Sequence, residues 1–148
     1  MKKYHDRANT PLSFHTFYRF VLLPLSSAIT LYNGISEFSQ ATYFHWLYVP
    51  EAAFIVISLS LAIACFIGFF GWKPYAWYSV MGYLAVSVLY WSTFLVIYAF
   101  YAPVLVAYTA GRLIGVLLHA ILVGIYYMKR RALFFPDNKH AAAADPIA

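Results

Sequence analysis

Four long apolar stretches joined by short connections constrain the fold of this chain more than any other feature of its sequence. A helix that crosses a membrane needs about 20 apolar residues, each adding about 1.5 Å to its length. Four such crossings use most of the 148 residues and leave no room for a second domain. Hydrophobic residues form 64% of the chain and charged residues only 10%, whereas soluble proteins average roughly half and a quarter. The sequence therefore predicts an all-α polytopic membrane protein, folded as a four-transmembrane-helix antiparallel bundle.

The basic residues predict the orientation of this bundle. Among the 10 Lys and Arg residues, only Arg112 falls toward the side on which the first and second helices are connected. The others fall on the opposite side: Lys2, Lys3, Arg7, Arg19, Lys73, Lys129, Arg130, Arg131 and Lys139. Basic segments are retained in the cytoplasm during insertion, so we expect both termini to be cytoplasmic (N-in/C-in). The net charge of +5 fits anionic membrane lipids as partners, and no basic stripe with exposed aromatic residues indicates nucleic acid.

Proline and glycine residues mark the expected ends of the helices. Thr10 and Pro11 are typical of a helix start, and Pro24 removes one backbone hydrogen bond and should bend the first helix. Gly71 should end the second helix. We expect a transmembrane domain over residues 11–131, with helices at about 11–36, 50–71, 74–100 and 103–128.

The remaining segments are expected at or beyond the membrane surface. Residues 1–10 form a cytoplasmic N-terminal segment, and residues 37–49 carry aromatic side chains that suit the outer interface. Residues 132–148 are predicted to be a mobile cytoplasmic tail, in which Leu133, Phe134 and Phe135 can rest on the inner leaflet.

Two polar stripes on the apolar helices give the candidate site. Ser26, Thr30, Asn33 and Glu37 are separated by four, three and four residues, which places them on one side of a helix. Arg112, His119 and Tyr126 recur every seven residues on the last helix. If the stripes face each other, they form a polar seam that opens outward, with Arg112 paired to Glu37 or Glu51. The candidate ligand- or partner-binding residues are Thr30, Asn33, Glu37, Glu51, Arg112 and His119.

The same stripes are compatible with a purely structural role. Interior polar residues often join helices, and an Arg112–carboxylate pair can simply hold two helices together. His119, near the predicted midplane, is either a satisfied neutral side chain or a proton relay. No companion ligands accompany it, because His5, His15, His45 and His140 are predicted at or beyond the interfaces. We therefore expect no metal and no cofactor.

Several other residues leave their roles open. Tyr83, Tyr90 and Trp91 fall deep in the third helix, where they line a pocket or a partner groove, or bond to local acceptors. Gly111 and Gly115 form a small-xxx-small pair, which we assign first to close helix packing within the bundle and second to self-association. Cys65, the sole cysteine, excludes an intrachain disulfide.

No catalytic signature accompanies these features. The chain has no nucleophile elbow, no phosphate-binding glycine loop and no histidine pair at zinc spacing, so we do not expect an enzyme. A lipid-modifying enzyme with His119 as base is a weaker alternative. In architecture alone, the chain resembles small bacterial four-helix membrane proteins, which implies a cytoplasmic membrane location.

Two functional hypotheses follow. The first is a small non-enzymatic membrane protein that binds a partner membrane protein, a lipid or an amphiphile through the outward-facing polar seam. The alternative is a subunit of a transporter or channel for a small solute, anion or proton, which uses Asn33, Arg112 and His119. Because four helices enclose little volume, transport would require a homo-oligomer or a continuous wet path.

Overall fold

The described part of the chain consists of helices and contains no strand. In a computed structural model, residues 12–40 and 48–135 are described, except for the side chains of residues 36–40 and 48. The elements are α1 (Ser13–Phe17), η1 (Tyr18–Leu22), α2 (Leu23–Gln40), α3 (Tyr48–Phe70), α4 (Pro74–Tyr101), η3 (Pro103–Leu105), α5 (Val106–Lys129) and α6 (Arg131–Phe134). Three of the described helices, Val49–Phe70, Pro74–Tyr101 and Pro103–Lys129, are long and apolar enough to cross a membrane. The all-α prediction is confirmed, and the helices are compatible with a membrane protein.

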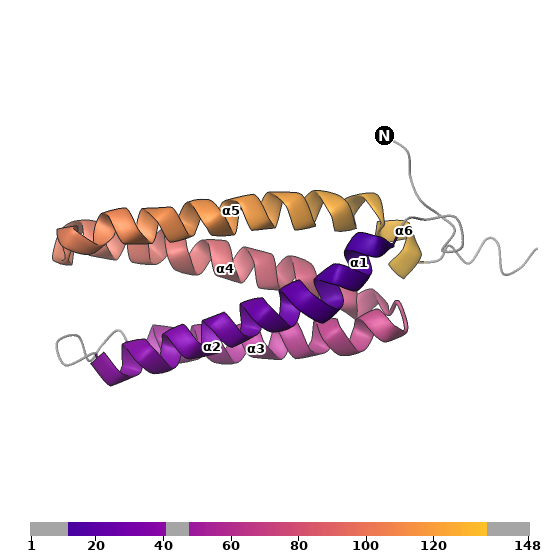
Figure 1. Cartoon of the computed structure of the whole chain (residues 1–148), viewed down its shortest axis with the longest axis horizontal. Coiled ribbons are helices and arrows are strands. Elements are labelled where there is room, and N and C mark those ends of the chain that lie inside the picture. The colour runs from indigo at the N-terminus through magenta and orange to yellow at the C-terminus, as the bar shows by residue number, and fades with distance from the viewer. Residues whose placement is uncertain (1–11, 41–47, 136–148) are drawn as a thin grey trace, which may run out of the picture.

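The long helices run beside one another along the long axis of the molecule (Figure 1). The helix α2 packs on α3, α3 on α4, and α4 on α5. In Figure 1 the pair of α4 and α5 diverges from the pair of α2 and α3 with distance from α6. We call the two ends of the molecule the α6 end and the η3 end. The short helix η3 connects α4 to α5 at the end where the two helix pairs lie farther apart.

The first helical run changes its geometry just before Pro24, where the sequence predicts a bend. The segment Tyr18–Leu22 is a π-helix, and the N–H of Leu23 bonds to the carbonyl of Tyr18, five residues back. Because Pro24 has no N–H, the carbonyl of Phe20 loses its usual partner, and the turn widens. The helix then continues to Gln40, beyond the expected end at residue 36. Of the expected connection 37–49, residues 41–47 lie outside the described residues.

The turn between α3 and α4 places a tryptophan where glycine is usual. The helix α3 ends at Phe70, and Trp72, not Gly71, adopts a left-handed backbone with φ of 52°. The N–H of Lys73 bonds to the carbonyl of Gly68 at 3.0 Å, which closes the helix end. A left-handed residue other than glycine costs about 1–2 kcal/mol. The ring of Trp72 offsets part of this cost by stacking on His15, with ring centres 4.3 Å apart.

Gly68 allows α3 and α4 to approach closely at this turn. A Cβ at this position would lie 2.6 Å from the Cβ of Ala76 and 2.6 Å from a ring carbon of Tyr75. We expect Gly68→Ala to lower the free energy of unfolding by about 1–3 kcal/mol, because overpacking forces the helices apart. Thermal denaturation in detergent measures the loss. At Gly124 a Cβ would meet nothing within 4 Å, so Gly124→Ala is the control and should not destabilise the fold. Equal stability of the two variants would contradict the close approach.

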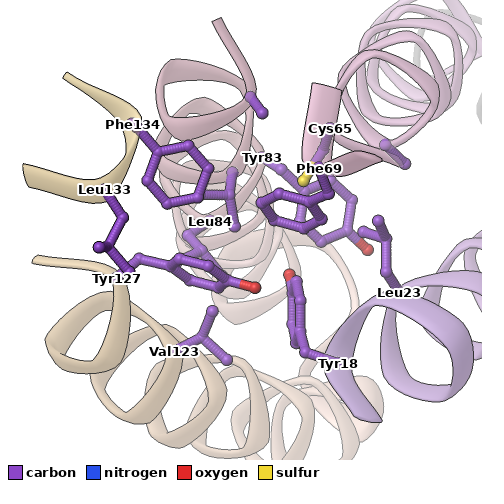
Figure 2. Packing of buried hydrophobic residues seen from close by; sticks show 13 residues of the cluster. Tyr18, Leu23, Cys65, Phe69, Tyr83, Leu84, Val123, Tyr127, Leu133 and Phe134 are labelled. Atoms are coloured by element: carbon purple, nitrogen blue, oxygen red, sulfur yellow. The ribbon is translucent and has the colours of Figure 1, made fainter. Parts of the chain in front are cut away.

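The apolar core is concentrated toward the α6 end (Figure 2). Tyr18, Phe69, Tyr127 and Phe134 are completely buried there, although they come from η1, α3, α5 and α6. The rings of Phe69 and Tyr127 stack with centres 5.2 Å apart. These contacts join the beginning, middle and end of the described chain in one cluster.

One sequence-based expectation fails in this cluster. The sequence predicts Leu133 and Phe134 on the inner leaflet within a mobile tail, but α6 turns them into the core, where they are 3% and 0% exposed. Packing of α6 against α3 and α5 outweighs the local preference of these residues for the membrane surface. His15 is also buried at this end of the molecule, where it stacks on Trp72 and its Nδ1 atom lies 3.1 Å from the Tyr127 hydroxyl. Residues 136–148 lie outside the described residues.

Candidate ligand-binding site

A cavity of about 500 Å³ lies among α2, α3, α4 and α5. Small-molecule sites in proteins measure roughly 300–1,000 Å³, so this volume suits a small ligand or the headgroup of an amphiphile. Its walls are formed by Ser26, Ile29, Thr30 and Asn33 of α2, Glu51, Phe54 and Ile55 of α3, Tyr83, Leu84, Ser87, Tyr90 and Trp91 of α4, and Arg112, Gly115, Val116 and His119 of α5. Hydroxyl, amide, imidazole and oppositely charged groups thus share one space between apolar helices.

The polar side chains of α2 reach the cavity because they share one face of the helix. Ser26, Thr30 and Asn33 are separated by four and three residues. The Thr30 hydroxyl donates to the backbone carbonyl of Ser26 at 2.9 Å, and the Ser26 hydroxyl donates to that of Leu23 at 3.0 Å. The Tyr83 hydroxyl of α4 donates to the Ser26 hydroxyl oxygen at 3.1 Å, which joins α2 to α4 across the cavity.

Arg112 lies in the second turn of α5, toward the η3 end. Its Nη2 atom donates to Oδ1 of Asn33 at 3.3 Å. The guanidinium carbon lies 4.9 Å from the ring centre of Trp91 and 4.5 Å from that of Tyr108. Aromatic faces attract cations, more strongly where water is excluded. Contacts from α2, α4 and α5 therefore fix this cation at the cavity wall.

Glu51 lies in the first turn of α3 and is 6% exposed. The Tyr90 hydroxyl donates to its Oε1 atom at 3.3 Å. The ring of Tyr90 stacks on Phe54, three residues along α3 from Glu51, with ring centres 3.8 Å apart and an angle of 12° between the planes. A buried carboxylate requires such hydrogen bonding. The site thus holds a carboxyl group beside two aromatic rings.

His119 faces the cavity about 10 Å along α5 from Arg112, by the rise of an α-helix. Its Nε2 atom is buried and makes no hydrogen bond within residues 12–40 and 48–135. Its ring centre lies 5.9 Å from that of Tyr18. A buried polar atom without a partner costs about 1–3 kcal/mol. A ligand atom that bonds to Nε2 would therefore gain affinity.

The cavity is closed toward the α6 end and opens between α2 and α5. Tyr83 and Leu84 belong both to its wall and to the buried core cluster, which continues through Leu23 and Val123 (Figure 2). In contrast, two wall residues, Ile29 of α2 and Gly115 of α5, are exposed at the surface. A ligand can enter from the side without crossing the core.

The structure brings five of the six predicted site residues to this one cavity: Thr30, Asn33, Glu51, Arg112 and His119. The sixth, Glu37, lies in α2, but its side chain is outside the described residues. Arg112 donates a hydrogen bond to the Asn33 amide oxygen, and its predicted pairing with Glu37 involves a side chain outside the described residues.

Phe54, Ser87 and Gly115 also line the cavity and were not predicted. Helical spacing could have found the first two, since Ser87 follows Tyr83 by four residues and Phe54 follows Glu51 by three. The preferred interpretation of Gly111 and Gly115 as a close helix contact within the chain is wrong for the described residues. A Cβ at either glycine would meet nothing within 4 Å. Gly115 instead leaves space for the cavity.

No family model, no curated protein and no solved structure matches the chain. Within the described ranges, no group of three or more His, Cys, Asp or Glu side chains is placed to hold a metal ion. The functional assignment therefore rests on the geometry and chemistry of the cavity.

Proposed function

We propose that this protein crosses the membrane four times, with both termini in the cytoplasm. The first helical run extends without a break from Ser13 to Gln40, roughly 40 Å at an α-helical rise. It packs along α3 and exposes the apolar side chains of Leu25, Ile29 and Ile35, which are 50–61% exposed and would contact lipid. The described basic residues other than Arg112 lie toward the α6 end, which supports a cytoplasmic location for that end: Arg19, Lys73, Lys129, Arg130 and Arg131.

We further propose that the protein is a non-enzymatic membrane protein that binds an amphiphile in the cavity. The observation that carries this proposal is the combination of a polar interior with an opening between two lipid-facing helices. The polar headgroup of the amphiphile would contact hydrogen-bonding and charged groups inside the cavity, and its hydrocarbon chain would extend between α2 and α5 into the lipid. A purely apolar ligand would leave the polar groups without partners, which is costly.

Transport of a small solute, anion or proton through Asn33, Arg112 and His119 is the second candidate. The buried Nε2 atom of His119, with no partner in the described residues, favours it. Passage through the protein would also require the packed cluster around Tyr83 and Leu84 to open. For this reason we favour binding over transport.

Filling the cavity tests the binding function. A Cβ at Gly115 has open space around it, so Gly115→Leu should place its side chain in the cavity without displacing the backbone. We expect this variant to lose most of the amphiphile that co-purifies with the wild-type protein in maltoside detergent, as counted by native mass spectrometry. Gly124→Leu is the matched control, because Gly124 also has open space but does not line the cavity.

The outcomes of this experiment separate the candidate functions. Equal retention of amphiphile by both variants would contradict binding in the cavity. A wild-type protein that retains none, but supports proton or anion flux in proteoliposomes that Gly115→Leu blocks, would favour transport.

A further inference from the structure

A cation lies on exposed aromatic rings toward the α6 end, where η1 contacts α3. The guanidinium carbon of Arg19 lies 3.2 Å from the ring centre of Phe70, 4.5 Å from that of Phe20 and 5.8 Å from that of Phe66. Phe20 and Phe70 are 53% and 60% exposed, and none of these four residues lines the cavity. We call Arg19 and its three rings the Arg19 cluster, which lies on the outer surface of the bundle.

The three rings support one another as well as the cation. The centres of Phe66 and Phe70 lie 5.3 Å apart, at 79° between the ring planes. Phe20 meets both of these rings edge to face, with centres 6.3 Å apart. Side chains from η1 and α3 thus fix the position of the guanidinium on the surface.

The rings hold Arg19 without using its hydrogen-bond donors. A stacked guanidinium keeps its N–H groups in its own plane, where they can bind two oxygens of one phosphate. No side-chain hydrogen bond or ion pair joins Arg19 to the rest of residues 12–40 and 48–135, and its Nε atom is buried without a partner. Arg130, at the same end, instead donates to the carbonyl of Tyr126 at 3.5 Å. Arg19 is therefore oriented but has no acceptor in the described chain.

No carboxylate among the described side chains can reach this cation. Only Glu51 carries one, and it lies 19 residues before Phe70 in α3, about 28 Å away at a helical rise. An anionic partner for Arg19 would thus come from outside the described chain.

The depth of the cluster suits a lipid phosphate. The helix α3 has 23 residues, so it is about 34 Å long, slightly more than the hydrocarbon thickness of roughly 30 Å. Its last residue, Phe70, would therefore lie at the boundary between hydrocarbon and headgroups, and Arg19 stacks on it at the same level. A phosphate at this boundary can accept from Arg19 while the acyl chain passes over the exposed rings. A free phosphate ion would gain nothing from the rings.

We propose that the Arg19 cluster binds a phospholipid of the cytoplasmic leaflet. The phosphate oxygens accept hydrogen bonds from Arg19, and an acyl chain covers Phe20 and Phe70. Charge-assisted bonds between Arg and phosphate are among the stronger hydrogen bonds in proteins. This inference rests on the proposed orientation of the α6 end, and it does not depend on amphiphile binding in the cavity.

Native mass spectrometry of the full-length protein in maltoside detergent, with added dimyristoylphosphatidylglycerol, tests the site. Arg19→Gln should weaken binding of this lipid about tenfold, the effect of one charge-assisted hydrogen bond. Lys129→Gln is the matched control, because Lys129 is a cation at the same end but has no ring contact among the described residues. It should leave lipid binding nearly unchanged. Equal weakening in the two variants would indicate a general effect of charge and would overturn the site.

Two further probes identify which part of the lipid is bound. Dimyristoylglycerol has the same acyl chains but no phosphate, and glycerol phosphate has the phosphate but no chains. We expect each to bind the wild-type protein about tenfold or more weakly than the phospholipid. These measurements are decisive even if Arg19→Gln fails to fold. Equal binding of dimyristoylglycerol would overturn the phosphate contact, and equal binding of glycerol phosphate would overturn a lipid as the ligand.

Gly115→Leu separates this site from the cavity. Loss of the phospholipid in Gly115→Leu but not in Arg19→Gln would place the lipid in the cavity and overturn the Arg19 site. Loss in Arg19→Gln with retention in Gly115→Leu would support the Arg19 site, whether or not the cavity binds an amphiphile.

Discussion

Replacing Phe134 with alanine should be among the most destabilising single changes in this protein. The ring is completely buried and packs against Phe69, Trp72 and Tyr127, with ring centres 5.1–6.0 Å away. Truncation of a buried aromatic side chain leaves a cavity that the neighbours fill only in part, so we expect Phe134→Ala to lower the free energy of unfolding by about 3 kcal/mol. Denaturant titration in a fixed detergent, followed by tryptophan fluorescence, measures the change.

Phe100→Ala is the matched control, because Phe100 is 79% exposed in α4. Its loss should change stability by about 0.5 kcal/mol or less, as is usual for exposed positions. The two variants also decide between the core and the membrane surface as the site of Phe134. A residue that rests on the leaflet would behave like Phe100, and equal effects would contradict the packing of α6 into the core.

The sequence predicts the long helices well because their signals are local. Pro74 and Pro103 begin helical segments where expected, since proline fits the first turn and cannot continue a preceding helix. The four-residue helix α6 carries no such signal. Its sequence is too short for periodicity, so the burial of Leu133 and Phe134 depends on the space left by α3 and α5. The left-handed backbone conformation of Trp72 could not be predicted for a similar reason, because its stacking partner His15 is far away in the sequence.

The sequence predicts which residues line the site, but not which of their side chains contact one another. The spacing of Thr30 and Asn33, and that of Arg112 and His119, fixes one face of each helix without any knowledge of the fold. Which side chains then meet depends on the rotation and relative height of the helices, which periodicity does not contain. The hydrogen bond from Arg112 to Asn33, for example, does not follow from the spacing of either residue in its own helix.

Cysteine labelling should show that the first helical run crosses the membrane. Cys65, the sole cysteine, is completely buried, so the wild-type protein should react little with maleimides. Single cysteines at Asn9, Val104 and Ala144 leave every basic residue in place, so the charge bias that sets orientation is retained. In intact cells, an impermeant maleimide should label Val104→Cys strongly, because Val104 is 87% exposed at the η3 end. Asn9→Cys and Ala144→Cys should stay unlabelled until the membrane is permeabilised.

The Asn9→Cys result separates four crossings from three. If only α3, α4 and α5 cross, the N-terminus lies on the same side as Val104, and Asn9→Cys would be labelled in intact cells. The polar residues Ser26, Thr30 and Asn33 would then belong to a helix outside the hydrocarbon, and the cavity wall that they form would face water. A water-facing wall would weaken every electrostatic contact in the site, since water screens charges far more than lipid does. Protection of Asn9→Cys would therefore support both the topology and a low-polarity setting for the cavity.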